Sequence, residues 1–160
     1  MFTGEEIMAA LDELGVTDVV WVPDSLLAQW EPALEAAPGL RLLRVCREGE
    51  AWPLAAGLHL GGRNPLVMMQ TTGLFESGDG LRNAVYDFRV PLFALIGARS
   101  WLVKNSTDSA RRFAEPVLQA WGLDYRIIER PEHKPLLVEH CLACRAAGRP
   151  GAVLVAEGRL

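Results

Sequence analysis

Short apolar runs alternate along the chain with longer segments whose apolar residues recur every three or four positions. Most of these runs are continuous Val, Leu, Ile, Met or Phe stretches without polar alternation, which is typical of strands buried on both faces of a parallel sheet. Six strands are therefore predicted, at Asp18–Val22, Arg41–Val45, Leu66–Gln70, Pro91–Gly97, Tyr125–Ile128 and Ala152–Ala156.

The segments between the strands predict helices. Thr3 is followed three residues later by Glu6, the spacing of a capping box, and Gly15 ends the first helical pattern. Because helices and strands alternate, we expect a three-layer α/β/α fold with a six-stranded parallel sheet, as one domain over residues 1–160. The other predicted helices are Ser25–Ala36, Glu48–Leu60, Asp79–Phe88, Thr107–Trp121 and Lys134–Ala147.

Composition narrows the classes of protein that fit. Half of the 160 residues are hydrophobic, 22% are charged and the net charge is −4, which excludes a disordered chain and a basic nucleic-acid binder. The apolar runs are shorter than the roughly 18 residues that span a bilayer, and the first residues lack the basic region of a secretory signal. Three cysteines do not make a disulfide framework, so we expect a cytoplasmic protein without nucleic-acid or membrane partners.

Ligands of parallel sheets bind beyond the carboxyl ends of the strands. Glu48 follows the second predicted strand, between apolar Val45-Cys46 and the small residue Gly49. We expect its carboxyl to be partly desolvated, a state in which an acid can exchange a proton near neutral pH. Glu50, two residues later, is interpreted as an ordinary acid at a helix start.

Polar residues also follow three other strands. Gln70 and the segment Thr71-Thr72-Gly73 form a predicted loop whose backbone N–H groups can approach a ligand, although spacing alone favours an ordinary polar loop. The pair Asp24-Ser25 follows the first strand, and Arg99 follows the fourth. Arg99 is a candidate for holding an anionic group, with a solvated surface charge as the alternative.

Other motifs are interpreted as structural. The segment Gly78–Asn83 nearly matches a dinucleotide fingerprint, but it lacks the last glycine and does not follow its strand directly, so nucleotide binding is rejected. Asp79 between two glycines is interpreted as a helix cap. Cys141 and Cys144 lie inside a predicted helix, where neither a redox pair nor a zinc site is expected.

Two stretches carry a resemblance to a known family. The run VVWVPDSLL (Val19–Leu27) resembles the first strand and loop of sulfopyruvate and phosphonopyruvate decarboxylases. The run from Cys46 to Leu74 is similar to the pyrimidine-binding domain of thiamine-diphosphate enzymes, with an acid, an Ala-Ala-Gly helix, a Gly-Gly turn, a buried strand and a Thr-Gly loop. Counting back from Gly57 puts the family's activating glutamate at Glu48.

The resemblance implies the pyrimidine-domain fold and the activity of a thiamine-diphosphate-dependent carboxy-lyase acting on 2-oxoacids. Glu48 would hydrogen-bond N1′ of the aminopyrimidine and promote the tautomer that removes the thiazolium proton, after which the thiazolium ring accepts the electrons of decarboxylation. Gln70 and the segment Thr71-Thr72-Gly73 would lie beside the cofactor. Asp24 and Ser25 would face the thiazolium side, and Arg99 would meet an anionic tail of the substrate.

The resemblance also implies a partner. The family holds Mg²⁺ and diphosphate on a second domain, through Gly-Asp-Gly and a later Asn. Here Gly78-Asp79-Gly80 and Asn105 match only by coincidence, so a beta subunit in a hetero-oligomer should supply that half, as for the alpha subunit of sulfopyruvate decarboxylase. A homodimer that uses these residues for Mg²⁺ and a non-catalytic α/β binding module are the alternatives. The stretch Leu74–Asn83 has no place in the resemblance, so the 2-oxoacid stays open.

Overall fold

The computed structural model describes residues 2–158, in which six parallel strands form one sheet in the order β2-β1-β3-β4-β6-β5. The strands are β1 (Asp18–Trp21), β2 (Arg41–Arg44), β3 (Pro65–Gln70), β4 (Phe93–Ala98), β5 (Asp124–Ile128) and β6 (Gly151–Ala156). The helices are α1 (Gly4–Glu13), α2 (Glu31–Ala36), α3 (Glu48–Leu60), α4 (Thr71–Glu76), α5 (Gly78–Arg82), α6 (Ser109–Ala120) and α7 (Leu136–Ala146), with short 3₁₀ turns at Ala28–Trp30 and Pro131–His133.

The sheet confirms the predicted fold class and all six strands. Every residue of β1, β4 and β6 is buried, and β3 is buried except at its last residue, as expected for continuous apolar runs. The edge strands β2 and β5 are partly exposed because each has only one neighbouring strand. The apolar pattern thus predicted the strands, and the structure adds which of them are central.

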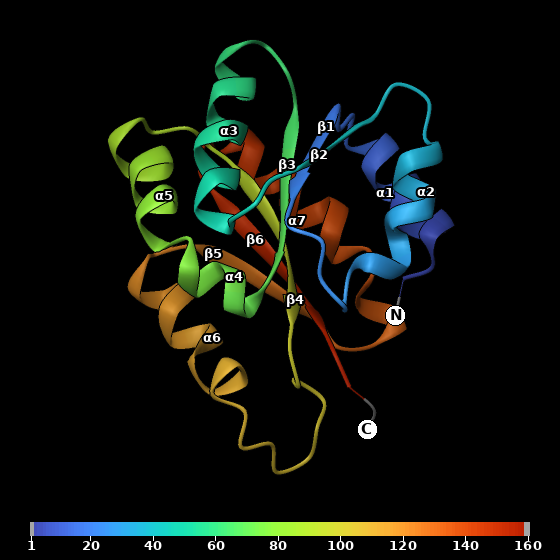
Figure 1. Cartoon of the computed structure of the whole chain (residues 1–160), viewed down its shortest axis with the longest axis vertical. Coiled ribbons are helices and arrows are strands. Elements are labelled where there is room, and N and C mark those ends of the chain that lie inside the picture. Colours follow the sequence, from blue (N-terminus) through green and yellow to red (C-terminus); the bar gives the residue numbers. More distant parts are fainter. Residues whose placement is uncertain (1, 159–160) are drawn as a thin grey trace.

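The helices cover both faces of the sheet. Helices α1, α2 and α7 pack on one face, and α3 to α6 pack on the other (Figure 1). Each face has its own apolar core, with Trp21 and Trp30 in the first and Trp52 in the second. In residues 2–158, no helix is both long and apolar enough to cross a membrane.

Two helices start where the sequence predicted. The Thr3 hydroxyl accepts a hydrogen bond from the Glu6 amide, and the Glu6 carboxylate accepts one from the Thr3 amide, so the capping box of α1 is confirmed. Helix α3 spans the predicted Glu48–Leu60. Pro53, the sixth residue of α3, lies inside the helix and lacks the N–H that would otherwise bond the Gly49 carbonyl.

The predicted loop after β3 is wrong. Residues Thr71–Glu76 form α4, which follows Gln70 without a connecting segment. Two threonines and a glycine are poor helix formers, so local propensity opposes this helix. Burial of Thr71, Gly73 and Leu74 against the sheet and α3 outweighs that preference.

Two further predicted helices differ in detail. The segment Ser25–Ala36 is helical only from Ala28, because the Asp24 carboxylate binds the amides of Leu26 and Leu27 and forms a turn there. The segment Asp79–Phe88 comprises α5 and a π-helical turn at Asn83–Asp87. Asp79 lies inside the first turn of α5 rather than capping it, so the interpretation as a cap is wrong.

The strand order also locates the natural ligand crevice of the sheet. From β1 the chain crosses to β2 on one side, while β3 and the later strands extend to the other side. Such a switch in direction opens a crevice at the carboxyl ends of the strands on either side of it, here β1 and β3. The segments that follow β1, β2 and β3 therefore lie where a ligand is expected.

Candidate functional site

Glu48 is the first residue of α3 and lies just beyond the carboxyl end of β2. Its residue is half-buried, in agreement with the predicted partial desolvation. The donors on either side of it are engaged elsewhere, since the Arg47 guanidinium and the Gly49 amide both bind Glu76. The Glu48 carboxylate is therefore left free of its neighbours in sequence and can accept a hydrogen bond from a ligand.

Gly73 of α4 lies against the Glu48 side chain. A Cβ atom at position 73 would stand 2.5 Å from Glu48 Cγ and 2.6 Å from Glu48 Oε1. Carbon atoms in ordinary contact are about 3.5–4.0 Å apart, so a larger residue at position 73 would displace the Glu48 side chain from this position. The glycine that the resemblance places beside the cofactor thus directly contacts the predicted catalytic acid.

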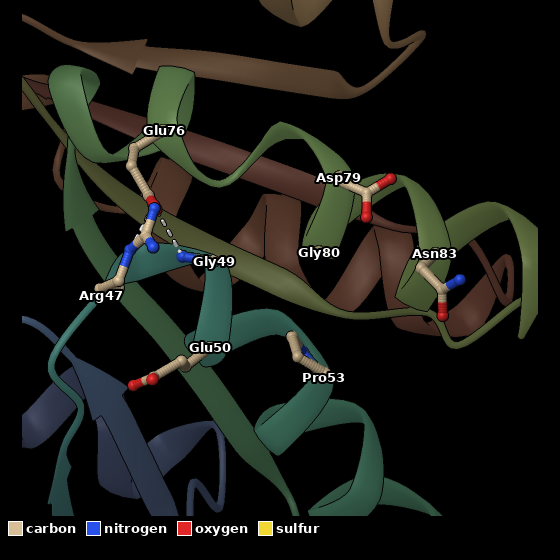
Figure 2. A pocket seen from close by; sticks show the side chains of 8 residues that line it. All are labelled: Arg47, Gly49, Glu50, Pro53, Glu76, Asp79, Gly80 and Asn83. Carbon is tan, nitrogen blue, oxygen red and sulfur yellow. Dashed lines mark hydrogen bonds and ion pairs between the residues drawn. The ribbon is translucent and has the colours of Figure 1, made fainter.

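Glu76, at the end of α4, binds both neighbours of Glu48. Its Oε2 accepts a hydrogen bond of 2.7 Å from the Gly49 amide, and its Oε1 lies 2.5 Å from the Arg47 guanidinium (Figure 2). Hydrogen bonding from Arg47, and then from Gly49, lowers the pKa of Glu76, which keeps this carboxylate charged. Sequence analysis missed Glu76 because its partners lie nearly thirty residues earlier in the chain.

Glu50 behaves as an ordinary acid at a helix start. Its carboxylate accepts a hydrogen bond of 3.1 Å from the Cys46 amide, and the residue is exposed. Figure 2 shows its side chain pointing away from Glu76. The two glutamates of the first turn of α3 therefore differ: Glu50 has a backbone donor as its partner, and Glu48 is left without those nearby donors.

The other residues predicted at the cofactor lie at the start of α4. Thr71 is fully buried, and no group in residues 2–158 forms a hydrogen bond with its Oγ1 atom. Gln70 is half-buried and Thr72 is exposed. An unpaired buried hydroxyl costs free energy in the isolated chain, so Thr71 marks a position where a ligand atom would be stabilising.

Asp24 and Ser25 follow β1, one strand away from Glu48. Asp24 Oδ1 accepts hydrogen bonds of 2.8 and 2.9 Å from the Leu26 and Leu27 amides, and Asp24 Oδ2 is buried without a partner in the described part of the chain. Burial raises the pKa of the Asp24 carboxyl, and the nearby charge of Glu157 adds to this increase. Ser25 is exposed.

Arg99, after β4, is not a free cation in the structure. Its Nε lies 3.1 Å from Asp108 Oδ2, and the same carboxylate oxygen accepts a hydrogen bond from Ser100. The Arg99 side chain is 52% exposed. A substrate anion would therefore have to share Arg99 with Asp108.

A cavity of about 460 Å³ lies between α3 and α5, on the side of α3 that meets Glu76 (Figure 2). Glu48 is not among its lining residues, although both of its sequence neighbours are. The cavity thus borders Glu76 and the two residues that flank Glu48, and it does not border the Glu48 carboxylate. It is lined by Arg47, Gly49, Glu50, Pro53, Glu76, Asp79, Gly80 and Asn83.

The alternative Mg²⁺ motif draws on two separate segments. Asp79 lies on α5, where it is exposed and paired with Arg82 at 2.9 Å. Asn105 lies in the connection between β4 and α6. Asp79 would have to give up Arg82 in order to bind an ion.

One group of metal-ligand side chains does converge, at the amino edge of the sheet. Atoms of Asp124, His140 and Cys144 lie within 4.8 Å of one another, but the Asp124 oxygens are paired with Arg126 and Arg149 at 2.8 Å each. These cations disfavour a metal ion in the same place. Burial raises the pKa of the neighbouring Cys141 thiol to about 11, so the cysteines are packing residues, as predicted.

The residues beyond β2 and β3 fit the pyrimidine half of thiamine diphosphate. Glu48 offers a free carboxylate to a ring nitrogen, Gly73 leaves room beside it, and Thr71 offers an unpaired hydroxyl. The diphosphate and Mg²⁺ need a set of oxygen ligands. Within residues 2–158 the one converging group of His, Cys, Asp and Glu side chains contains a thiol and two arginine-paired oxygens, so that group does not supply such a set.

Comparison with known proteins supports this fit. The chain is 27% identical over 134 residues to the sulfopyruvate decarboxylase subunit alpha of Methanothermobacter thermautotrophicus, covering 83% of this chain and 78% of that subunit. It is 35% identical over 91 residues to the phosphonopyruvate decarboxylase of Streptomyces viridochromogenes, covering 57% of this chain but only 23% of that enzyme.

The fold has a clear counterpart among solved structures. Benzoylformate decarboxylase from Polynucleobacter necessarius superposes with a TM-score of 0.72 at 20% identity, over 98% of this chain and 30% of that one. Residues 1–107 match the family described as the thiamine pyrophosphate enzyme, N-terminal TPP binding domain. The chain therefore belongs to this family of thiamine-pyrophosphate-binding domains.

Proposed function

We propose that this chain is the alpha subunit of a thiamine-diphosphate-dependent 2-oxoacid decarboxylase of the sulfopyruvate or phosphonopyruvate type. The observation that carries the proposal is the free carboxylate of Glu48, held at the carboxyl edge of the sheet against Gly73. Glu48 accepts the hydrogen bond of the pyrimidine ring and holds a proton at its N1′ atom. The bound cofactor supplies the electron sink that makes loss of carbon dioxide possible.

The remaining residues of the edge bind and orient. The Thr71 hydroxyl forms a hydrogen bond with the cofactor. Gln70, Thr72 and Gly73 line the same side of the cofactor. Asp24 and Ser25 face the substrate from the end of β1, and Arg99 contacts its anionic end while still bound to Asp108. Because Asp24 already uses Oδ1 for two backbone amides, only its Oδ2 atom is open to a new partner.

The partner is a beta subunit that carries the diphosphate-binding domain and the Mg²⁺ ligands, in a cytoplasmic hetero-oligomer. Helix α3, which carries Glu48, leaves Leu54 39% exposed and Leu60 71% exposed. These apolar side chains suit a covered surface better than a solvated one. Cys46, Cys141 and Cys144 are all free thiols, which suits a reducing compartment.

The test uses the full chain mixed with a beta-type subunit, thiamine diphosphate and Mg²⁺, with carbon dioxide release measured from sulfopyruvate, phosphonopyruvate and benzoylformate. Glu48→Gln should lower turnover by at least about 100-fold, the usual contribution of a positioned proton-transfer group. Glu50→Gln is the matched control, because the amide oxygen can still accept from Cys46, and it should stay within about twofold of the unaltered chain. Full turnover by Glu48→Gln would overturn the proposal.

Calorimetry of the chain alone separates the alternatives. We expect no tight binding of thiamine diphosphate with Mg²⁺ in the absence of the beta subunit, because the one converging group of metal-ligand side chains in residues 2–158 is already paired with arginines. Tight binding without a partner would instead favour the self-sufficient homodimer. If Asp79→Ala then abolished that binding, Gly78-Asp79-Gly80 would be the metal motif after all.

A further inference from the structure

The stretch Leu74–Asn83, which has no place in the family resemblance, surrounds the first turns of α3. It contributes the end of α4 and all of α5. A Cβ atom on Gly80 would clash with the Gly49 carbonyl oxygen, so α5 approaches the backbone of α3 as closely as a glycine permits. The Ser77 hydroxyl, fully buried, accepts a hydrogen bond of 2.9 Å from Trp52 Nε1. This segment therefore holds the start of α3 at several points.

Glu76 holds the two residues that flank Glu48. Helix α3 has Arg47 as its N-cap residue, and this side chain makes no capping hydrogen bond. The orphan amide of Gly49 is satisfied instead by Glu76, from another helix, at 2.7 Å. The other oxygen of Glu76 binds the Arg47 guanidinium through Nε at 3.0 Å and a terminal nitrogen at 2.5 Å. One carboxylate thus fixes the backbone after Glu48 and the side chain before it.

The engagement of Arg47 also protects the chemistry of Glu48. A guanidinium binds any carboxylate within reach, and Arg47 is adjacent to Glu48 in the chain. While Glu76 occupies Arg47, the Glu48 carboxylate stays available to a ligand. Gly73, one turn before Glu76 on α4, meanwhile limits where the Glu48 side chain can lie.

We propose that Glu76 is a positioning residue for Glu48: it caps the first turn of α3 from outside, keeps Arg47 away from the Glu48 carboxylate and holds α4 so that Gly73 lies against the Glu48 side chain. This inference rests on the proposed function of Glu48. Functional groups need placement to within about 0.5 Å, and a carboxylate at a helix start without a cap of its own lacks that precision. Glu76 supplies it without touching the cofactor.

The first experiment uses the full chain alone, so that it does not depend on the proposed activity. Hydrogen exchange of the Gly49 amide and the nuclear Overhauser contact between Glu48 Hγ and Gly73 Hα are measured by NMR. In Glu76→Ala the Gly49 amide should exchange about fivefold faster, as expected for the loss of one capping hydrogen bond, and the Glu48–Gly73 contact should weaken. Glu76→Gln keeps the acceptor and should preserve the Gly49 protection.

Asp79→Ala is the matched control for this experiment. Asp79 is another acidic residue lining the same cavity, but it pairs with Arg82 on its own helix and not with α3. Its removal should leave both NMR signals unchanged. If Glu76→Ala does not fold, Glu76→Asp replaces it, because the shorter side chain keeps the charge and should lose part of the same protection and contact.

The second experiment measures kcat and KM in the reconstituted enzyme at saturating thiamine diphosphate. Glu76→Ala should lower kcat by about tenfold with little change in KM, since a misplaced group mainly affects the transition state. Glu76→Gln should recover part of the lost kcat, and Asp79→Ala should match the unaltered enzyme.

The outcomes separate the two claims. An unchanged Gly49 exchange rate and an unchanged Glu48–Gly73 contact in Glu76→Ala overturn the positioning role, whatever the activity. Faster exchange together with an unaltered kcat also overturns it, because Glu76 would then be only a helix cap. Loss of the contact in a chain that never shows activity supports the placement of Glu48 by Glu76 and sinks the proposed function instead.

Discussion

The two edges of the sheet treat their acidic residues in opposite ways. At the amino edge, Asp18 begins β1 and its side chain is fully buried, yet both carboxylate oxygens are satisfied. Arg41 lies 2.5 Å from one oxygen, and Arg63 and Thr17 bind the other at 2.8 and 2.7 Å. At the carboxyl edge, Glu48 is left free by its neighbours, and Asp24 Oδ2 is buried without a described partner.

The difference separates structural acids from those available for chemistry. The Asp18 cluster joins β1, the start of β2 and the residues before β3, so its hydrogen bonds hold three neighbouring strands in register. At the carboxyl edge the available guanidinium, Arg47, is bound by Glu76 rather than by Glu48. The proposed function requires such a difference, because a ligand can bind Glu48 only if no cation already holds its carboxylate.

The largest effect should come from removing the structural acid. Asp18→Ala leaves Arg41 and Arg63 without their shared partner and should lower the free energy of unfolding by about 2–3 kcal/mol. That is less than the roughly 3–5 kcal/mol for a fully buried pair, because both arginines are partly exposed and water can solvate them. Urea unfolding of this variant beside Asp12→Ala, an exposed acid on α1, measures the difference. A loss below about 1 kcal/mol would remove the contrast between the edges.

Stability should fall at low pH, because the acid at the amino edge, Asp18, stabilises the fold in its ionised form. Burial alone would raise the pKa of Asp18, but hydrogen bonds from Arg63, Thr17 and Arg41 outweigh it, so the net pKa is lowered. The unfolded chain then binds the proton more readily. The stability contributed by ionised Asp18 is therefore full above its unfolded pKa of about 3.9 and is lost as the pH falls below that value. The stability gap between the unaltered chain and Asp18→Asn should narrow below about pH 4, and a constant gap would contradict this.

The smallest effect should have the opposite sign, at the carboxyl edge. Since the pKa of Asp24 is raised, the folded chain holds its proton more tightly and ionisation near neutral pH costs stability. Asp24→Asn keeps the Oδ1 acceptor for Leu26 and Leu27 and removes the buried charge, so it should stabilise the chain by up to about 1 kcal/mol at pH 7. The gain should disappear once the pH falls below the unfolded value of about 3.9. Thermal unfolding at both pH values measures it, and destabilisation at pH 7 would show that Asp24 has an ionic partner.

Much of the fold followed from local pattern. Continuous apolar runs predicted the strands because a strand buried on both faces cannot alternate with polar residues. Helix α3 was predicted over its observed bounds, with Glu48 at its start, a few residues after the second strand. These are properties of neighbouring residues, which the sequence displays in order.

The support of the site did not follow from pattern. Helix α4 is built from residues with weak helix propensity, and its burial against the sheet and α3 decides its conformation. Glu76 gave no signal, since an isolated Glu in a polar segment is ordinary until Arg47 and Gly49 are brought to it. The interpretation of Asp79 as a cap failed because α5 begins at Gly78, one residue earlier than predicted, which puts Asp79 inside the first turn, where it pairs with Arg82.

The sequence by itself determined the layered α/β architecture, the six strands and the acid after β2, because these depend on hydrophobic periodicity and chain order. Only the tertiary structure decided which acids are satisfied and which are free. Hydrogen bonds between residues nearly thirty positions apart, such as Arg47 with Glu76, depend on how the helices pack. Packing is a property of the whole fold. It pairs the Asp18 carboxylate with two arginines, and it pairs the donors next to Glu48 with Glu76 instead of with Glu48.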